Sequence, residues 1–150
     1  MPFEWIPDGT VTSVPGFRAS GVACGIKGAG QLDLALIVSE RPCAAAALFT
    51  TNRFPAAPVL YDRSLLAAHP GAIRAVAINS GCANACTGDE GLADAREMAA
   101  LTAEAVGVRL EEVLLMSTGV IGARLPLGCL RRGLPAAARA LSATGGALAA

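Results

Sequence analysis

Hydrophobic residues occur in short runs over much of the chain, and glycine, proline or polar residues bound most of these runs. Runs of this length, rich in leucine, isoleucine and valine, are typical of β-strands. Lys27–Gly30 separates the first two runs and predicts a tight turn between them. Residues 1–20 are rich in proline, glycine, serine and threonine, which predicts an irregular leader. The predicted strands are Val22–Ile26, Leu32–Val38, Ala44–Thr50, Pro58–Tyr61, Ile73–Asn79 and Val113–Met116.

Helical periodicity is clearest over Leu92–Val106. Apolar residues recur there at spacings of three and four, which places them on one side of a helix. Met98 and Leu101 belong to one such face, and further apolar residues form a second face. We therefore expect other elements to cover this helix on two sides. Acidic residues stand at its start, where they suit the helix dipole, and Gly107 suits its C-terminal end.

Two further helices are predicted over Ser64–Ala68 and Pro126–Ala140, and Pro135 could break the second. The tail, Ser142–Ala150, predicts no defined structure. Several strands followed by a strand–helix–strand–helix order predict an α/β class, here an α+β layered sandwich. The chain shows neither an internal repeat nor a composition shift, so we expect residues 1–150 to form a single domain.

Composition and charge narrow the possible partners. Twelve basic and twelve acidic residues balance, and Lys27 is the only lysine, so nucleic-acid binding is not expected. Hydrophobic residues reach 53%, charged residues only 16%, and alanines number 32. Because the chain is so apolar and carries so few charges, we expect it to bury part of its surface against a second segment of the same gene product or against another subunit. A compact, alanine-rich monomer is the alternative.

Membrane insertion, disulfides and metal binding are not expected either. The longest apolar run, Cys43–Phe49, is far shorter than the roughly 18–20 residues that a spanning helix needs. The first residues lack the pattern of a secretion signal, so a cytoplasmic location is predicted. The five cysteines are odd in number and include no CxxC pair. We expect Cys82 and Cys86 to be small buried residues, with a reactive thiol as the alternative.

Candidate chemistry is concentrated in Ser117–Thr118–Gly119, where a predicted strand ends. A hydroxyl and a backbone N–H at such a bend can donate to one oxygen, which is the arrangement of an oxyanion hole. The alternative is a simple turn in which Thr118 satisfies local backbone groups. Asn79–Ser80–Gly81 has the same small, polar character, so two such segments at one sheet edge would form a small polar site.

The residues themselves provide neither a convincing nucleophile nor a general base. His69 precedes a proline in a predicted loop, which argues against a catalytic triad. Glu111 and Glu112 are adjacent, so we expect them to point apart and to be solvated. The residues alone therefore indicate an oxyanion site as the candidate chemistry and identify no further catalytic group.

Eight short segments, in their order along the chain, form a recognisable set of motifs. They are residues 15–21, 25–27, 33–36, 46–52, 56–59, 79–88, 117–122 and 125–126. Together they resemble the N-terminal part of the ornithine acetyltransferase family, whose members are also called bifunctional glutamate N-acetyltransferase/amino-acid acetyltransferase, of arginine biosynthesis. The resemblance covers about residues 9–135, and the blocks 79–88 and 117–122 together are highly specific.

The resemblance implies an acetyltransferase made as one precursor that cleaves itself before a threonine. That threonine begins the β chain, acts as nucleophile, and carries acetyl from N-acetylornithine, or acetyl-CoA, to glutamate by a ping-pong mechanism. The resemblance assigns Thr118 and Gly119 to the oxyanion hole, through the threonine hydroxyl and the glycine N–H. It also implies a layered sandwich shared by α and β chains, further association of αβ units, and neither metal nor cofactor.

The family's α chain continues through a Met-Thr-Thr-Asp block and a Lys-Gly segment that this sequence lacks. We therefore expect residues 1–150 to be a partial domain from the α side, inactive alone, with the nucleophile outside this chain. Thr50, Thr51 and Thr144 are not expected to replace it. Two alternatives stay open: a non-catalytic small-molecule binding or scaffold module, and a related self-processing amidase or aminopeptidase.

Overall fold

The structure is a computed structural model that describes residues 5–149. Four strands form one sheet, in which the second strand is antiparallel to the first and to the third, and the fourth runs parallel to the third. Sheet order follows chain order, so the first and fourth strands are the edges. The elements are η1 (Val11–Ser13), β1 (Phe17–Val22), β2 (Leu34–Cys43), α1 (Ala57–Ala68), β3 (Ile73–Cys82), α2 (Gly88–Val106), η2 (Leu110–Glu112), β4 (Val113–Val120), α3 (Leu127–Arg139) and α4 (Gly146–Ala149).

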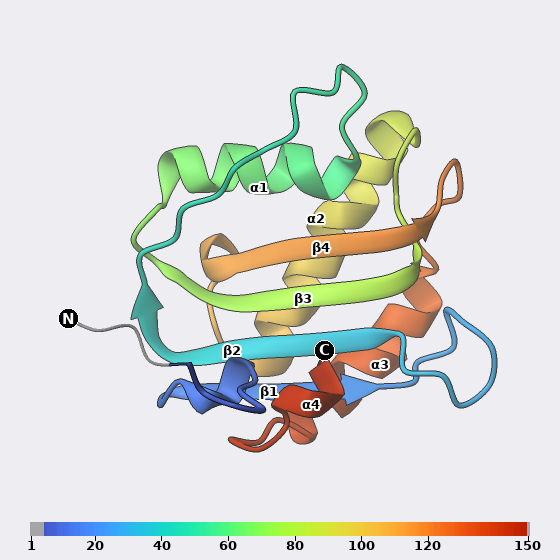
Figure 1. Cartoon of the computed structure of the whole chain (residues 1–150). Helices are drawn as coiled ribbons and strands as arrows, with labels where there is room; N and C mark the ends of the chain where they lie inside the picture. The colour runs from blue at the N-terminus through green and yellow to red at the C-terminus, as the bar shows by residue number, and fades with distance from the viewer. Residues whose placement is uncertain (1–4, 150) are drawn as a thin grey trace.

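Helices α2 and α3 lie on one side of the sheet, and α1 runs along the edge of the sheet beyond β4 (Figure 1). Helices α2 and α3 cover this face, and α1 packs against α2 and β4. The short α4 lies on the other side, over β1 and β2. This layered arrangement confirms the predicted α+β class.

The hydrophobic core fills the space between the sheet and the helices. Alternate residues of β3, beginning with Ile73, are buried, as expected for a strand with one covered face. Small side chains let α2 approach closely, and its Ala95 and Ala99 are fully buried around Met98. Because α1 and α3 both contact α2, the prediction that this helix is covered on two sides is confirmed.

Most of the strong periodic segments are confirmed, with longer strands than predicted. Strands β2, β3 and β4 extend beyond the predicted C-terminal residues. Helix α2 ends before Gly107, whose φ of +72° is the left-handed conformation expected there. Pro135 does not break α3, because Leu134 and Ala137 on either side of it are buried in the core.

Two predicted strands are wrong. Pro58–Tyr61 belongs to the first turns of α1, where proline is well tolerated because the first N–H groups of a helix lack partners. The helix predicted over Ser64–Ala68 is only the second half of α1. Ala44–Thr50 forms no regular strand; alanine has little preference for sheets, and β2 ends at Cys43.

The beginning of the sheet also differs from the prediction. Strand β1 starts at Phe17, within the segment predicted to be irregular, and ends at Val22, where a strand was predicted to begin. The connection to β2 spans residues 23–33 and is longer than the predicted tight turn. Residues 142–149 are likewise more ordered than predicted, since Ser142 bridges to Ala19 and α4 follows.

Among residues 5–149, no helix lies over the second face of the sheet along β3 and β4 (Figure 1). We call it the open face, and it is formed by Val76, Ile78, Ser80, Met116, Thr118 and Val120. Met116 and Val120 are 55% and 62% exposed, which is large for apolar side chains on a sheet. Within residues 5–149, none of the helices is long and apolar enough to cross a membrane.

Candidate functional site

The small polar residues at the C-terminal ends of β3 and β4 lie side by side. These strands are parallel, so their C-terminal ends lie next to each other at the same end of the sheet. The prediction that the two segments share one edge is therefore confirmed, although both lie inside strands rather than in turns that follow them. The paired residues are Asn79 with Ser117, Ser80 with Thr118, and Gly81 with Gly119.

Glycine is required where these two strands end. Gly119 has φ +131°, and a Cβ atom there would lie 2.2 Å from the carbonyl carbon of Gly81. Gly81 has φ +115°, and its own Cβ would lie 2.8 Å from Cγ2 of Ile26. L side chains rarely adopt such φ values. The two backbones therefore approach more closely than any side chain would allow.

Thr118 and Gly119 are exposed and present two different donors. By strand alternation, the Thr118 side chain points to the open face, because its neighbours in β4 from Val113 to Leu115 alternate with it. The N–H of Leu115 points away from β3 to Asp62 of α1, 3.0 Å away, so the N–H of Gly119, four residues on, points to the same side of β4. Their role as oxyanion donors stays a prediction.

A buried asparagine, predicted only as the last residue of a strand and the first of a small polar segment, connects the two strand ends. Asn79 is fully buried, and its Oδ1 accepts a hydrogen bond of 2.6 Å from the hydroxyl of Ser117. Its Nδ2 donates to the carbonyl of Cys82 at 2.8 Å. Both ends of the amide are thus satisfied, and the bond to Ser117 holds the residue before Thr118 against β3. An asparagine within an apolar strand is the signal that could have revealed this role.

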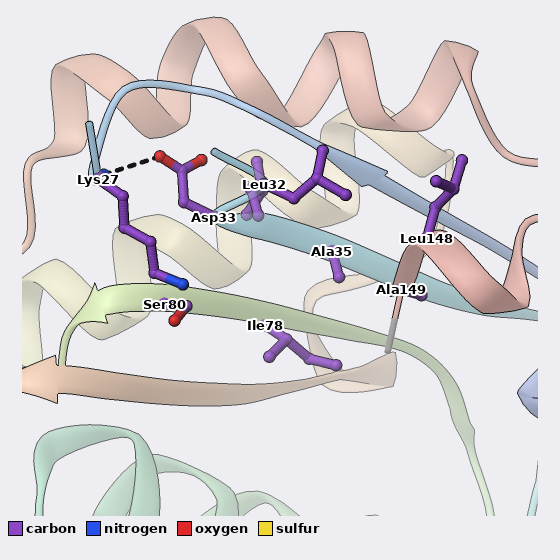
Figure 2. A pocket seen from close by; sticks show the side chains of 9 residues that line it. Lys27, Leu32, Asp33, Ala35, Ile78, Ser80, Leu148 and Ala149 are labelled. Carbon is purple, nitrogen blue, oxygen red and sulfur yellow. Dashed lines mark hydrogen bonds between the residues drawn. The ribbon is translucent and has the colours of Figure 1, made fainter. Parts of the chain in front are cut away.

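A second feature missed from the sequence is the loop before β2. The carboxylate of Asp33 accepts backbone N–H groups from four consecutive residues, Cys24–Lys27, at 2.7–3.1 Å. Burial opposes ionisation of Asp33, but these N–H groups outweigh it and lower the pKa of Asp33. Figure 2 shows the result: the backbone of Lys27 is tied to Asp33, while its side chain extends toward Ser80.

Arg124 fixes the segment that follows β4. Its guanidinium binds the buried carboxylate of Asp94 through two hydrogen bonds of 2.5 and 2.6 Å, and it also pairs with Glu90 at 2.8 Å. The thiol of Cys82 donates to the carbonyl of Ala123, one residue earlier. These contacts attach the chain beyond Gly119 to α2 and to the end of β3.

The remaining candidates lie elsewhere. His69 ends α1 and precedes β3, so it is at the opposite end of the sheet from Thr118. The prediction that Glu112 is solvated is wrong: it is buried, because its carboxylate accepts the N–H of Arg109. Cys82 is buried as predicted, but Cys86 is exposed, because its φ of +57° places it in the turn before α2.

Comparison with known proteins decides the family. The sequence model of the ArgJ family matches residues 18–150. The chain belongs to the ArgJ family. Arginine biosynthesis bifunctional protein ArgJ from Symbiobacterium thermophilum is 51% identical over 146 residues, which are 96% of this chain and 36% of that protein. The ArgJ protein of Geobacter sulfurreducens is 54% identical over 123 residues, 82% of this chain and 31% of that one.

Solved ArgJ structures share the fold. Ornithine acetyltransferase from Mycobacterium tuberculosis, complexed with ornithine, superposes with a TM-score of 0.91 at 44% identity, over 97% of this chain and 78% of that chain. The ArgJ protein of Bacillus halodurans gives 0.85 at 38% identity, over 94% of this chain and 73% of that one. The chain spans about a third of the length of the curated ArgJ relatives that it matches.

Proposed function

We propose that the chain is the α-side portion of a glutamate N-acetyltransferase of arginine biosynthesis. The observation that carries the proposal is the exposed Thr118–Gly119 pair, held beside Ser80 and Gly81 near the C-terminal end of β4. Its support is the membership of the ArgJ family, whose curated relatives are named as bifunctional proteins of arginine biosynthesis. The neighbour complexed with ornithine supports an amino-acid substrate.

The proposed reaction begins when a threonine hydroxyl, on a segment outside this chain, attacks the acetyl carbonyl of N-acetylornithine. The carbonyl oxygen becomes an oxyanion, which accepts hydrogen bonds from the Thr118 hydroxyl and the Gly119 N–H. The C–N bond then breaks, ornithine leaves with a proton on its amine, and an acetyl-enzyme forms. The amine of glutamate attacks this ester in the second half-reaction and restores the threonine. Acetyl-CoA is an alternative donor.

The open face supports a partner from the same precursor. Its exposed apolar side chains, among them Met116 and Val120, adjoin Thr118. We propose that the β chain covers this face, bringing its N-terminal threonine to the C-terminal end of β4. Residues 1–150 are then a partial domain that the β chain completes, and αβ units associate further.

The proposed chemistry needs neither metal nor cofactor, because a hydroxyl and an N–H supply the oxyanion donors and the nucleophile's own amine can act as base. Dialysis of the complete protein against EDTA is expected to leave acetyl transfer unchanged. The proposal includes a cytoplasmic location, which cell fractionation tests.

The deciding experiment is the denaturing intact mass of the protein purified from its natural source, with N-terminal sequencing of every chain and an acetyl-transfer assay. A second chain that begins with threonine, together with transfer from N-acetylornithine to glutamate, supports the proposal. Peptide hydrolysis without acetyl transfer would favour a self-processing amidase or aminopeptidase. An uncut protein that binds amino acids but transfers nothing would favour a binding module.

A further inference from the structure

The side chain of Lys27 lies beside the proposed oxyanion donors. Its Cγ would be 3.2 Å from a Cβ on Gly81, so the aliphatic stem runs directly over the end of β3. Figure 2 shows the ammonium turned toward Ser80, on the face of the sheet opposite α2 and α3. Ser80 is the register partner of Thr118. The order across the sheet, from β3 to the edge strand β4, is therefore Lys27, Ser80 and Thr118.

The backbone that carries Lys27 is fixed in place. Its N–H donates to Oδ2 of Asp33 at 2.9 Å, and Ile26, the preceding residue, donates to the same oxygen at 2.7 Å. Asp33 is itself 2% exposed. A buried carboxylate that gathers consecutive N–H groups is a strong restraint, since each bond to a charged acceptor is roughly twice as strong as a neutral one. The chain therefore holds Lys27 over this site before any ligand arrives.

The ammonium lies at a groove of about 230 Å³, with Ile78 and Ala35 from the sheet and Leu148 from α4 among the lining residues. Among the residues that the structure describes, its Nζ takes part in no ion pair. The only acid in the groove lining is Asp33, whose oxygens are occupied by N–H groups. A cation with a hydroxyl beside it, in a partly apolar groove, is a favourable binding site for the carboxylate of a ligand.

We propose that Lys27, assisted by the Ser80 hydroxyl, binds the α-carboxylate of the amino-acid substrate next to the Thr118–Gly119 edge. The inference rests on the proposed function, since it names the group that orients the acyl donor there. In an N-acetylated amino acid the carboxylate and the acetyl carbonyl are separated by only the amide nitrogen and the α-carbon. Residues on adjacent strands, about 4.8 Å apart, can therefore hold both groups of one molecule.

The test is equilibrium binding of ornithine to the complete natural protein by isothermal titration calorimetry, compared with 1,4-diaminobutane, which lacks the carboxylate. Lys27→Met is expected to weaken ornithine binding by about 10–100-fold, the usual effect of losing a hydrogen bond to a charged group. Binding of 1,4-diaminobutane stays unchanged. Lys27→Arg keeps most of the affinity for ornithine. Arg96→Met, which removes an exposed cation from α2 on the helix side, is the matched control and changes neither.

Two results would overturn the inference: ornithine binding unaffected by Lys27→Met, or equal weakening of both ligands. Because calorimetry needs no turnover, the two proposals fail separately. If the protein binds ornithine through Lys27 but transfers no acetyl group, the proposed function is contradicted and the proposed carboxylate subsite is supported. If the protein transfers acetyl groups but binds ornithine equally well without Lys27, the proposed function is supported and the subsite is contradicted.

Discussion

The hydroxyl of Ser117 donates a hydrogen bond of 2.6 Å to Oδ1 of Asn79, a side chain with no exposed surface. One strand end thereby holds the other at the residue that precedes Thr118. Ser117→Ala leaves this buried oxygen without its donor, so we expect the free energy of unfolding to fall by about 1–3 kcal/mol. Urea unfolding of the complete protein measures the loss.

Ser64→Ala, on the exposed side of α1, is the matched control and should change stability by less than about 0.5 kcal/mol. Equal stability of the two variants would show that the bond between Ser117 and Asn79 contributes nothing to the fold.

Thr118→Ala tests the proposed oxyanion donor. Loss of one such donor typically lowers turnover by about 100–1000-fold, so we expect kcat for acetyl transfer to fall by that order and self-cleavage to slow. Thr118→Ser keeps the hydroxyl and should have a mild effect. Steady-state kinetics and the rate of appearance of cut chains are the measurements.

Thr51→Ala provides the control for Thr118, because Thr51 is exposed in the segment between β2 and α1 and is not expected to act as nucleophile. Turnover of Thr118→Ala equal to that of Thr51→Ala would remove Thr118 from the mechanism.

Gly119→Ala, compared with a second glycine variant, separates two reasons for glycine at this position: the lack of space for a Cβ atom and the positive φ. The new Cβ would lie 2.2 Å from the carbonyl carbon of Gly81 at an unfavourable φ of +131°. We expect a loss of roughly 2–4 kcal/mol in unfolding free energy, from overpacking and backbone strain together. Gly122 also has a positive φ, +82°, but nothing within 4 Å of its Cβ position.

Gly122→Ala should therefore cost only about 1 kcal/mol, through φ alone. The measured quantity is the urea midpoint of each variant. A Gly122→Ala variant as unstable as Gly119→Ala would mean that the close approach to Gly81 is not what requires glycine.

Asp62 gives the fold a pH dependence. Burial raises its pKa from 3.8 to about 7, although the N–H of Leu115 opposes this shift. An acid whose pKa rises on folding binds its proton more tightly in the folded state, so ionisation destabilises the fold. The contribution of Asp62 to stability is therefore fully present below about pH 4 and is lost as the pH rises to about 7.

Asp62→Asn keeps an oxygen that can accept the N–H of Leu115 but cannot ionise. We expect the variant to be more stable than the natural protein at pH 7, by on the order of 2 kcal/mol after solvent screening, with the difference shrinking toward pH 4. Urea unfolding between pH 4 and 8 measures this difference. Parallel stability curves for the two proteins would contradict the prediction.

The parts of the fold that could be predicted from sequence are those with one dominant period. Helix α2 and strand β3 each have a clear alternation between covered and exposed positions. Pro58–Tyr61 was misassigned because a short apolar run fits a strand and a helical turn equally well, and only tertiary packing distinguishes them.

The location of the candidate site could be predicted from the sequence, but the contacts that hold its residues in place could not. Thr118 and Gly119 stand out because a strand ends in small polar residues. The contacts that fix them join residues far apart in sequence: Asn79 with Ser117, and Gly81 with Gly119. No local pattern encodes such pairings, because they depend on which strands become neighbours.

The crossover from β3 through α2 to β4 has a consequence for the order of events in a newly made chain. Ser80 and Thr118 become neighbours only when β4 has paired with β3, and the whole of α2 lies between them in the sequence. The proposed site, in which Thr118 lies beside Ser80, therefore has no defined geometry in a nascent or half-folded polypeptide. If cleavage of the proposed precursor depends on Thr118, cleavage follows folding, and an unfolded chain is not cut.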